Sequence, residues 1–339
     1  MSRVPGLVNR RVVVAGLVAS CCASVQAYSA TSFSGATLTI LVGFPPGGGV
    51  DGGARLIGRH LPRFLEGQPS VVVQNMPGAG GLLAADHLFN RAPRDGLTLG
   101  VPGRNWPLAP LVAQREARFK PLDFEYIGST GEVTTYVWIN KALGVNTPEE
   151  FKASKREIVF GGFTPDTEPS MVPKILALEG YPAKAVSGYA GTAAIINAIE
   201  RGEVDGIATN VASFGRRPDL AERCVRVFQA LPSAGAKFPI AAEHVSPRGR
   251  GLLQLAAYAS ATGMPLVAPP GSPPDRLAAL RSAFDRMARD PEFAGDAEKM
   301  GEPHGSPVDG EAIKRILAST LEMASPDLVD LFRSLAAKT

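Results

Sequence analysis

Apolar positions in the first part of the chain alternate between short runs and helical stripes. Residues 36–44 carry a compact apolar run that predicts a buried β-strand. A helix is predicted over residues 51–65, where the apolar positions repeat on one helical face: Ala54, Ile57, Leu61 and Leu65. Pro62 lies inside this stripe, and because proline lacks an N–H group it predicts an end or a kink of the helix there.

The same rhythm of strand, loop and helix continues along the chain. Further strands are predicted at 70–74, 97–101, 136–140, 158–161, 206–209 and 266–268, the first of them of the buried type. Further helices are predicted at 82–89, 170–179, 191–201 and 275–289, and Thr147 is expected to cap another that begins at Pro148. This alternation is typical of an α/β fold with a mostly parallel sheet.

The first 27 residues have the order of an export signal. Three arginines precede the apolar stretch 12–20, which is far shorter than the ~20 residues that span a bilayer, and residues 25–27 form a small-residue cleavage site. Two alternatives stay open. Residues 9–12 partly resemble a twin-arginine signal, and residues 17–21 resemble a lipoprotein box that would leave Cys21 lipidated. We expect an exported, periplasmic protein, with a lipid anchor at Cys21 as the alternative to a soluble form.

Charge and cysteine content narrow the classes of partner. The chain has 35 basic and 32 acidic residues, and three of the basic ones lie in the export signal, so the remainder carries equal numbers of each. We therefore expect no nucleic-acid partner, because no basic field is present to attract one. Beyond the signal only Cys224 remains, which cannot form an internal disulfide and is expected to be a small core residue.

Two glycine-rich loops, Phe44–Asp51 and Asn75–Gly81, each lie between a predicted strand and a predicted helix. Ligands of open α/β sheets bind beyond the carboxyl ends of the strands, where both loops are placed. A helix N-terminus presents unpaired N–H groups and a partial positive charge, and glycine lets a ligand approach the backbone closely. The two loops are therefore predicted to hold one carboxylate together.

Both loops also resemble the ligand loops of the Bug/TctC family, the extracytoplasmic solute receptors of tripartite tricarboxylate transporters. The first reads Phe-Pro-Pro-Gly-Gly-Gly-Val-Asp and the second Asn-Met-Pro-Gly-Ala-Gly-Gly. Segments with further resemblance are 92–99 with an inserted Arg94, 189–192 with Ala190 in place of a basic residue, 202–205, and 266–273. The resemblance covers residues 36–320, and the two loop motifs are specific only in combination.

The resemblance implies a two-lobe, Venus-flytrap fold of the type II periplasmic binding proteins, with the ligand cleft between the lobes. Lobe 1 would comprise residues 36–137 and 264–339, and lobe 2 residues 138–263. It implies a receptor without catalytic residues, metal or cofactor, which acts as a monomer and delivers a small carboxylate to the membrane permease subunits of its transporter. That carboxylate is a dicarboxylate, an aromatic carboxylate or an acidic amino acid.

The expected ligand-binding residues follow from the same resemblance. In the first lobe they are Phe44, Pro46, Gly47, Gly48, Asp51, Asn75, Gly78, Ala79, Gly80 and Trp106. In the second lobe they are Gly162, Phe163, Thr164, Tyr189 and Asp205. Structural roles stay open for several of them. Asp51 could simply cap its helix, Asn75 could be a turn residue, Trp106 and Phe163 could belong to the core, and Tyr189 could pack at the hinge.

Three rival functions are weaker. Residues 47–52 match the Gly-x-Gly-x-x-Gly fingerprint of dinucleotide-binding oxidoreductases, but no clear acid follows about 20 residues on. An exported enzyme would need a nucleophile and a base, and no Gly-x-Ser-x-Gly motif or metal-ligand spacing of histidines is present. A ligand sensor for a signalling partner would use the same cleft, so the sequence does not separate it from a transport receptor.

Overall fold

A computed structural model describes residues 32–47, 49–112, 117–190, 192–211, 218–232, 237–302, 304 and 306–337. The expected export signal with Cys21, the loop residue Gly48 and the helix-entry residue Gly191 lie outside the described residues. No helix in the described ranges combines the length and the apolar character needed to cross a bilayer.

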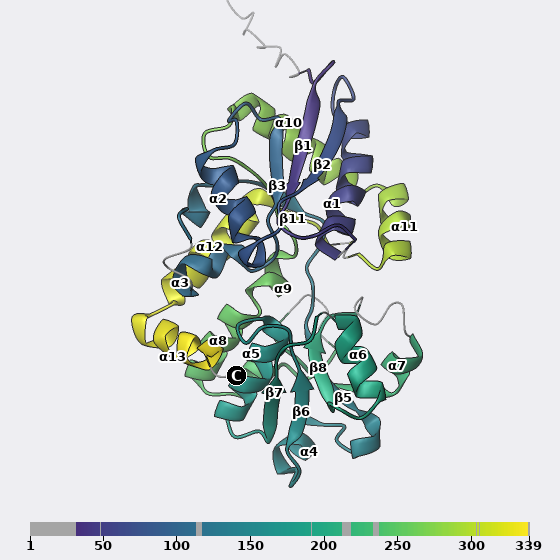
Figure 1. Ribbon diagram of the computed structural model, residues 1–339, viewed down its shortest axis with the longest axis vertical. Coiled ribbons are helices and arrows are strands. Elements are labelled where there is room, and N and C mark those ends of the chain that lie inside the picture. The colour runs from purple at the N-terminus through teal and green to yellow at the C-terminus, as the bar shows by residue number, and fades with distance from the viewer. Residues whose placement is uncertain are drawn as a thin grey trace, which may run out of the picture.

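The described chain folds into two α/β lobes, each built on its own sheet (Figure 1). The first sheet contains β1 (Thr37–Val42), β2 (Ser70–Asn75), β3 (Thr98–Val101), β4 (Glu125–Ser129), β10 (Leu266–Ala268) and β11 (Val308–Asp309), in the order β11-β4-β10-β3-β1-β2. The second contains β5 (Tyr136–Asn140), β6 (Ile158–Gly161), β7 (Ala183–Val186), β8 (Gly206–Thr209) and β9 (Cys224–Gln229), in the order β7-β6-β8-β5-β9. The predicted two-lobe α/β class is confirmed, and the boundaries near residues 137 and 263 stay predictions.

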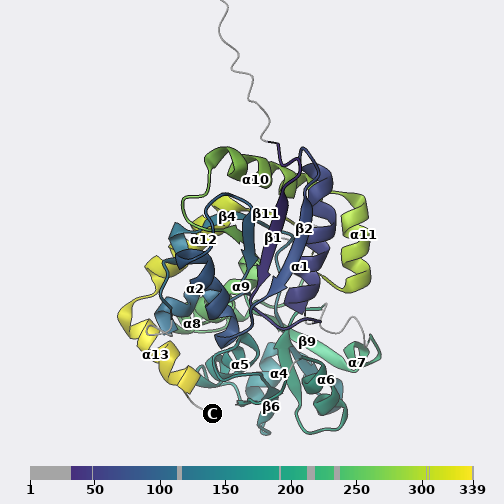
Figure 2. The same ribbon diagram turned by 45° about the horizontal axis from the view of Figure 1, so that its top comes forward.

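Helices cover both sheets (Figure 2). In the first part of the chain they are α1 (Gly49–His60), α2 (Leu82–Asn90), α3 (Ala109–Val112), α4 (Pro148–Ala153), α5 (Glu168–Leu178), α6 (Thr192–Glu200) and α7 (Pro218–Glu222). The remainder are α8 (Pro247–Ala256), α9 (Tyr258–Thr262), α10 (Pro274–Ala288), α11 (Pro291–Met300), α12 (Gly310–Met323) and α13 (Pro326–Ala337).

Local signals set several of these boundaries. α1 ends at His60, and Leu61–Phe64 continue as a 3₁₀ turn because Pro62 cannot extend the α-helical hydrogen bonds. The Thr147 hydroxyl accepts a hydrogen bond from the Glu150 N–H at 3.1 Å, so the predicted cap of α4 is confirmed.

Each sheet is mixed, so the prediction of a mostly parallel sheet is wrong. β1 pairs in parallel with β2 and β3, and β6 pairs in parallel with β7 and β8. β5 and β10 run antiparallel to their neighbours. The connectivity explains this. The chain enters the second lobe at β5 and returns to the first at β10, so both strands start at the lobe-facing edge, where the parallel strands end.

β2 lies at the edge of the first sheet, and the prediction of a buried strand there is wrong. Its residues alternate between exposed and half-buried, and Val72 is 43% exposed. Val71 and Val73 pack against Gly58 of α1, while the opposite face of the strand remains in solvent. A run of valines fits a half-covered edge strand as well as a central one.

One buried hydrophobic cluster continues from the first lobe into the second. It includes Tyr126 of β4, Val137 of β5 and Phe160 of β6, together with Leu328 and Phe332 of α13. The lobes are therefore packed together on the side of α8, α9 and α13 (Figure 1).

Candidate functional site

The loops that follow β1, β2 and β3 meet at the lobe-facing edge of the first sheet. A Cβ atom at Gly43 would lie 2.1 Å from the carbonyl oxygen of Pro102, and one at Gly81 would lie 1.9 Å from that same oxygen. Gly43 and Gly81 also approach each other, because a Cβ on Gly43 would lie 2.8 Å from the Gly81 Cα. Only glycine permits three backbone segments to come so close.

A side-chain network ties the first two loops together. Asn75 Nδ2 donates to the Phe44 carbonyl oxygen at 2.9 Å and to Asp51 Oδ1 at 2.8 Å. The other carboxylate oxygen of Asp51 accepts from the Gly47 N–H at 2.8 Å and from Arg55 Nε at 2.9 Å. Arg55 also donates to Asn75 Oδ1 at 3.1 Å. Both oxygens of Asp51 are thus occupied by protein donors, and the residue is only 2% exposed.

Asp51 is ionised in this network. Its pKa is lowered to about 2, first by the hydrogen bond from Arg55, against the opposing effect of burial, and further by the bonds from Asn75 and Gly47. The carboxylate also lies in the first turn of α1, where the helix dipole favours a negative charge. Asp51 and Asn75 therefore shape the loops rather than present free polar groups to a ligand, which agrees with the structural alternatives for both.

The second loop has a backbone conformation that most residues avoid. Gly78, Gly80 and Gly81 have φ angles of 152°, 63° and 96°, and Ala79 between them has a φ of 47°. Successive residues of this kind can turn their N–H groups toward one concave point that binds an anion. Gly78, Ala79 and Gly80 are exposed, whereas Gly81 is buried under the neighbouring loops.

The structure gathers most of the predicted first-lobe residues at this edge. Those within the described residues are Phe44, Pro46, Gly47, Asp51, Asn75, Gly78, Ala79 and Gly80. Pro46 and Gly47 are exposed, and Phe44 is half-buried against the cluster that contains Val42 and Val101. Whether these residues contact a ligand stays a prediction.

A second pair of loops lies at the lobe-facing edge of the other sheet, after β6 and β7. The Gly188 N–H donates to the Phe163 carbonyl oxygen at 2.6 Å, and the Tyr189 N–H donates to that of Gly162 at 3.2 Å. Phe163 and Tyr189 are half-buried and pack against the cluster around Trp138, whereas Thr164 is exposed. Phe163 and Tyr189 therefore combine a core contact with an open side.

Asp205 lies at the wrong end of the second lobe for the predicted site. It precedes β8, and its carbonyl oxygen accepts from the N–H of Asn140, the last residue of β5. Because β5 starts at the lobe-facing edge, Asn140 and Asp205 lie at the far edge. The Asp205 carboxylate binds Arg156 at 2.7 Å and the Val159 N–H at 2.9 Å, which fixes the turn before β8.

Trp106 belongs to the core rather than to a pocket wall. It is 2% exposed and packs against Phe119, Phe124 and Tyr126, at ring separations of 5.4, 4.7 and 6.3 Å. The segment after β3 contributes to the site through the backbone at Pro102 instead. Sequence reasoning missed Arg55, although its place four residues after Asp51 on a helix was a usable signal. The contact with Pro102 had no such signal.

Among the described residues, no group of three or more His, Cys, Asp and Glu side chains is placed to hold a metal. Cys224 is a buried core residue as predicted, and burial raises the pKa of its thiol to about 11. A cavity of about 850 Å³ lies between α8 and the α12–α13 corner, and no predicted site residue lines it.

Several known proteins are similar in sequence to part of this chain. A UPF0065 protein from Pseudomonas sp. strain P51 is 41% identical over 29% of each chain. The protein BugT of Bordetella pertussis is 32% identical over 45% of this chain and 48% of the relative. A UPF0065 protein of Cupriavidus necator is 24% identical over 78% of both chains. The alignments with the first two relatives thus span less than half of their lengths.

Solved structures share the fold over nearly the whole chain. A TctC solute-binding protein from Polaromonas has a TM-score of 0.65 at 16% identity, covering 89% of this chain and 98% of the other. The periplasmic binding protein BugD has a TM-score of 0.61 at 18% identity, with the same coverage of 89% and 98%. The model of the tripartite tricarboxylate transporter family receptor matches residues 54–316, which include the greater part of α1, most of both sheets and the second loop. The chain therefore belongs to this TctC family of solute-binding receptors, which are not enzymes.

Proposed function

We propose that the protein captures a small dicarboxylate in the periplasm and delivers it to the membrane subunits of a tripartite tricarboxylate transporter. One carboxylate of the ligand binds at the edge of the first lobe, between residues 44–51 and 75–81. The rest of the ligand lies against the second lobe. Ligand binding favours the closed arrangement, because both lobes contact the ligand only when they are together.

The convergence of the glycine-rich loops carries this proposal. α1 starts at Gly49, and its first N–H groups have no acceptor within the helix. α2 starts at Leu82 after the turn Ala79–Gly81, and the Leu82 N–H donates to the Ala79 carbonyl oxygen. The positive φ angles of Gly78, Ala79 and Gly80 add further N–H groups on one concave surface. These groups suit a carboxylate and need no arginine at the site.

The occupied carboxylate of Asp51 bears on the ligand's charge. A ligand with a cationic amino group would want an acidic partner, and Asp51 was the acid in the first-lobe loops best placed for that role. Its oxygens instead accept from Gly47, Arg55 and Asn75. Within the first-lobe loops this favours a carboxylate without an amino group over an acidic amino acid, whereas Asp166 lies exposed in the second-lobe loop. Two of the solved neighbours, at 20% and 19% identity, hold malate and adipate, which are dicarboxylates without an amino group.

The far end of the ligand is assigned to the second lobe. Phe163 and Tyr189 each pack in part on the core and stay partly exposed, and the exposed Thr164 donates its hydroxyl to Asp166 Oδ1 at 2.6 Å. An apolar carbon chain between two carboxylates would fit against the two rings.

A thermal-shift screen tests this function. L-malate, adipate, benzoate, L-glutamate, glucose and NAD are added separately, and the melting temperature is recorded. A dicarboxylate at about 100 times its Kd should raise the melting temperature by about 5 °C. A shift with glucose or NAD and none with any carboxylate would refute the proposal. A larger shift with L-glutamate than with the dicarboxylates would refute the argument from Asp51.

A matched pair of variants locates the site. Gly80 and Gly202 have φ angles of 63° and 72°, and a Cβ on either would meet no atom within 4 Å. Gly80→Val and Gly202→Val therefore introduce similar backbone strain, one at the predicted site and one before β8 at the far edge of the second lobe. Gly80→Val should weaken dicarboxylate binding more than about tenfold. Equal affinity in the two variants would remove the second loop from the site.

A further inference from the structure

The C-terminal helix α13 connects the two lobes. It contacts α3, which follows β3 of the first sheet, and it contacts α5 and α8 of the second lobe. In both ribbon views the chain ends beside the second lobe, although the strand that precedes α12 belongs to the first (Figures 1 and 2). The arrangement of the lobes therefore depends on how α13 is attached to each.

The attachment to the first lobe combines one polar and several apolar contacts. Arg333 Nε donates to the Leu111 carbonyl oxygen of α3 at 2.7 Å. Val329 and Phe332 are 7% and 6% exposed, and they face Leu108 and Leu111 around a small void. This end of α13 is held both by packing and by a charged donor.

Lys174 provides the polar attachment of α13 to the second lobe. Lys174 Nζ, on α5, donates to the Leu335 carbonyl oxygen of α13 at 3.0 Å and to the Pro165 carbonyl oxygen at 3.1 Å. Leu335 lies in the last turn of α13, where carbonyl groups have no partner within the helix and a positive charge is favoured. Pro165 lies in the loop after β6, between Thr164 and Asp166. One ammonium group thus joins the end of α13 to that loop.

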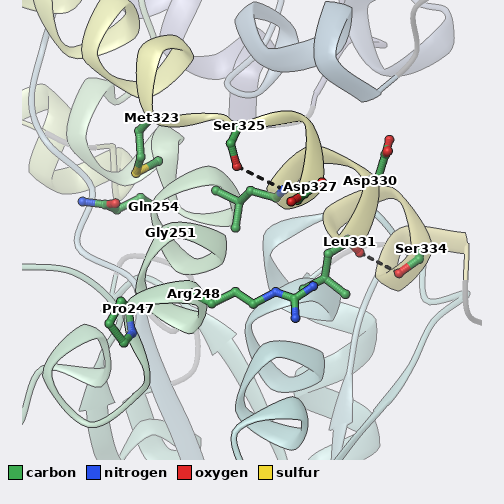
Figure 3. A pocket seen from close by; sticks show the side chains of 11 residues that line it. Pro247, Arg248, Gly251, Gln254, Met323, Ser325, Asp327, Asp330, Leu331 and Ser334 are labelled. Carbon is green, nitrogen blue, oxygen red and sulfur yellow. Dashed lines mark hydrogen bonds between the residues drawn. The ribbon is translucent and has the colours of Figure 1, made fainter.

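Packing between α13 and α8 is interrupted, which increases the importance of this link. Leu328 packs on Gly251 at the start of α13. Beyond that contact the cavity of about 850 Å³ opens between the helices, and Arg248 extends beneath Leu331 across it (Figure 3). At the C-terminal end of α13, Leu335 is buried and its carbonyl oxygen accepts from Lys174.

We propose that Lys174 is a positioning residue that couples the loop at residues 162–167 to the lobe-bridging helix α13. The proposal rests on the proposed function, because this loop is the one assigned to the ligand's far end. Any movement of α13 relative to the second lobe pulls on Lys174 and changes the position of the Pro165 carbonyl group. The position of the loop assigned to the ligand therefore depends on the relative position of the two lobes. Lys174 itself does not touch the ligand.

Hydrogen–deuterium exchange of the ligand-free protein tests the coupling directly. Lys174→Met keeps the apolar stem and removes the donors. Exchange at the Thr167 and Gly188 amides, which bond to Thr164 and Phe163, should become about tenfold faster. The control is Lys184→Met, an exposed lysine on β7 whose nearest acid, Glu157, is 3.9 Å away. Exchange in Lys174→Met equal to that in the control would overturn the proposal.

A double-mutant cycle separates coupling from local loosening. Arg333→Met releases α13 from Leu111 and leaves Lys174 in place, and it should also speed exchange at Thr167 and Gly188. Because both substitutions act through one link, the double variant should exchange no faster than Lys174→Met alone. Unchanged exchange in Arg333→Met, or additive effects in the double variant, would contradict the coupling. The Arg333→Met measurement decides the question even if Lys174→Met does not fold.

Ligand affinity is the second test of the proposal, with adipate and L-malate as probes. Lys174→Met should weaken binding of whichever probe stabilises the wild type by about tenfold, and Lys174→Arg should restore most of it. Faster exchange with unchanged affinity would overturn the positioning role. If neither probe binds to the wild type, the proposed function fails in its dicarboxylate form, and the exchange arm still decides the role of Lys174.

Discussion

The two lobe-facing loop pairs are held together in different ways. In the first lobe an ionised carboxylate, Asp51, joins the loops through Gly47, Arg55 and Asn75, and glycines let the backbones touch. In the second lobe the loops are joined by backbone hydrogen bonds of Phe163 and Gly162 and by neutral hydroxyl groups. A network around a buried charge strongly prefers one geometry. The first pair of loops, which we call the anchor, is therefore expected to keep one arrangement. The second pair has no such charged network and is expected to adapt its shape more readily.

This difference suits a receptor that binds the two ends of one ligand in different ways. In the proposed function the first pair would offer N–H groups at fixed positions to a carboxylate. The remainder of the ligand would then lie against Phe163, Thr164 and Tyr189. Lys174 connects that more adaptable pair to α13. Specificity would then change through the second lobe, while the anchor stays the same.

The largest effect is expected at Gly81, where the anchor has no spare room. Gly81→Ala places a Cβ 1.9 Å from the Pro102 carbonyl oxygen at a φ of 96°. The backbone must move apart, and the free energy of unfolding should fall by about 3 kcal/mol or more, measured by urea denaturation. Gly180→Ala is the control, since its φ is 85° and its Cβ would meet no atom within 4 Å. Similar losses in both variants would mean that the loops do not meet as described.

Asp51→Asn should have the next largest effect, and it should depend on pH. The folded pKa of about 2 lies below the ordinary value of 3.8, so the carboxylate stabilises the fold above about pH 4 and ceases to do so as the pH falls through 2. We expect a loss of about 2 kcal/mol near neutral pH, most of which disappears as the pH is lowered through this window. Urea midpoints of the variant and wild type across pH give this difference.

Asp205→Asn provides the matched comparison in the other lobe. It breaks the ion pair with Arg156, whose side chain is 61% exposed, at the far edge of the second sheet. Stability should fall, while dicarboxylate affinity should stay within about twofold of the wild type. Asp51→Asn should lower both the stability and the dicarboxylate affinity. Loss of affinity in Asp205→Asn would return that residue to the site.

Ser170→Ala should have the smallest effect. The Ser170 hydroxyl is fully buried and lies 3.1 Å from that of Ser187, which links α5 to the loop after β7. Removing a neutral hydrogen bond should cost about 1 kcal/mol in unfolding free energy. Ser334→Ala, which removes an exposed hydroxyl bonded to Leu331, should cost less. A cost for Ser170→Ala above that of Asp51→Asn would reverse the comparison between the pairs.

Much of the first-lobe site was accessible from the sequence. The strand at 37–42, the two glycine-rich loops and the helices after them follow one another without a break, so local pattern was enough to place them. The roles of Asp51 and Asn75 were less accessible. They lie 24 residues apart, and only the pairing of β1 with β2 brings them within 2.8 Å.

The second lobe was harder to read. Asp205 lies in a recognisable sequence motif just before β8. The edge of the sheet at which β8 starts depends on the direction of the chain through both lobes. The position of Trp106 was equally hard to predict. Its aromatic neighbours decide whether the indole lines a pocket or packs in the core, and the sequence does not identify those neighbours. Neither residue could be assigned before the path of β5 and the ring cluster around Phe124 were known.

The sequence by itself determined the class of fold, the family and the positions of the two glycine-rich loops, because each depends on residues that are neighbours along the chain. Tertiary structure alone decided that the sheets are mixed, that Asp51 is occupied by protein donors, and that α13 bridges the lobes, with Arg333 bound to the first lobe and Lys174 of the second lobe bound to Leu335. These features depend on contacts between distant segments. Their free energies come from burial and hydrogen bonding in the folded state, and no local pattern carries them.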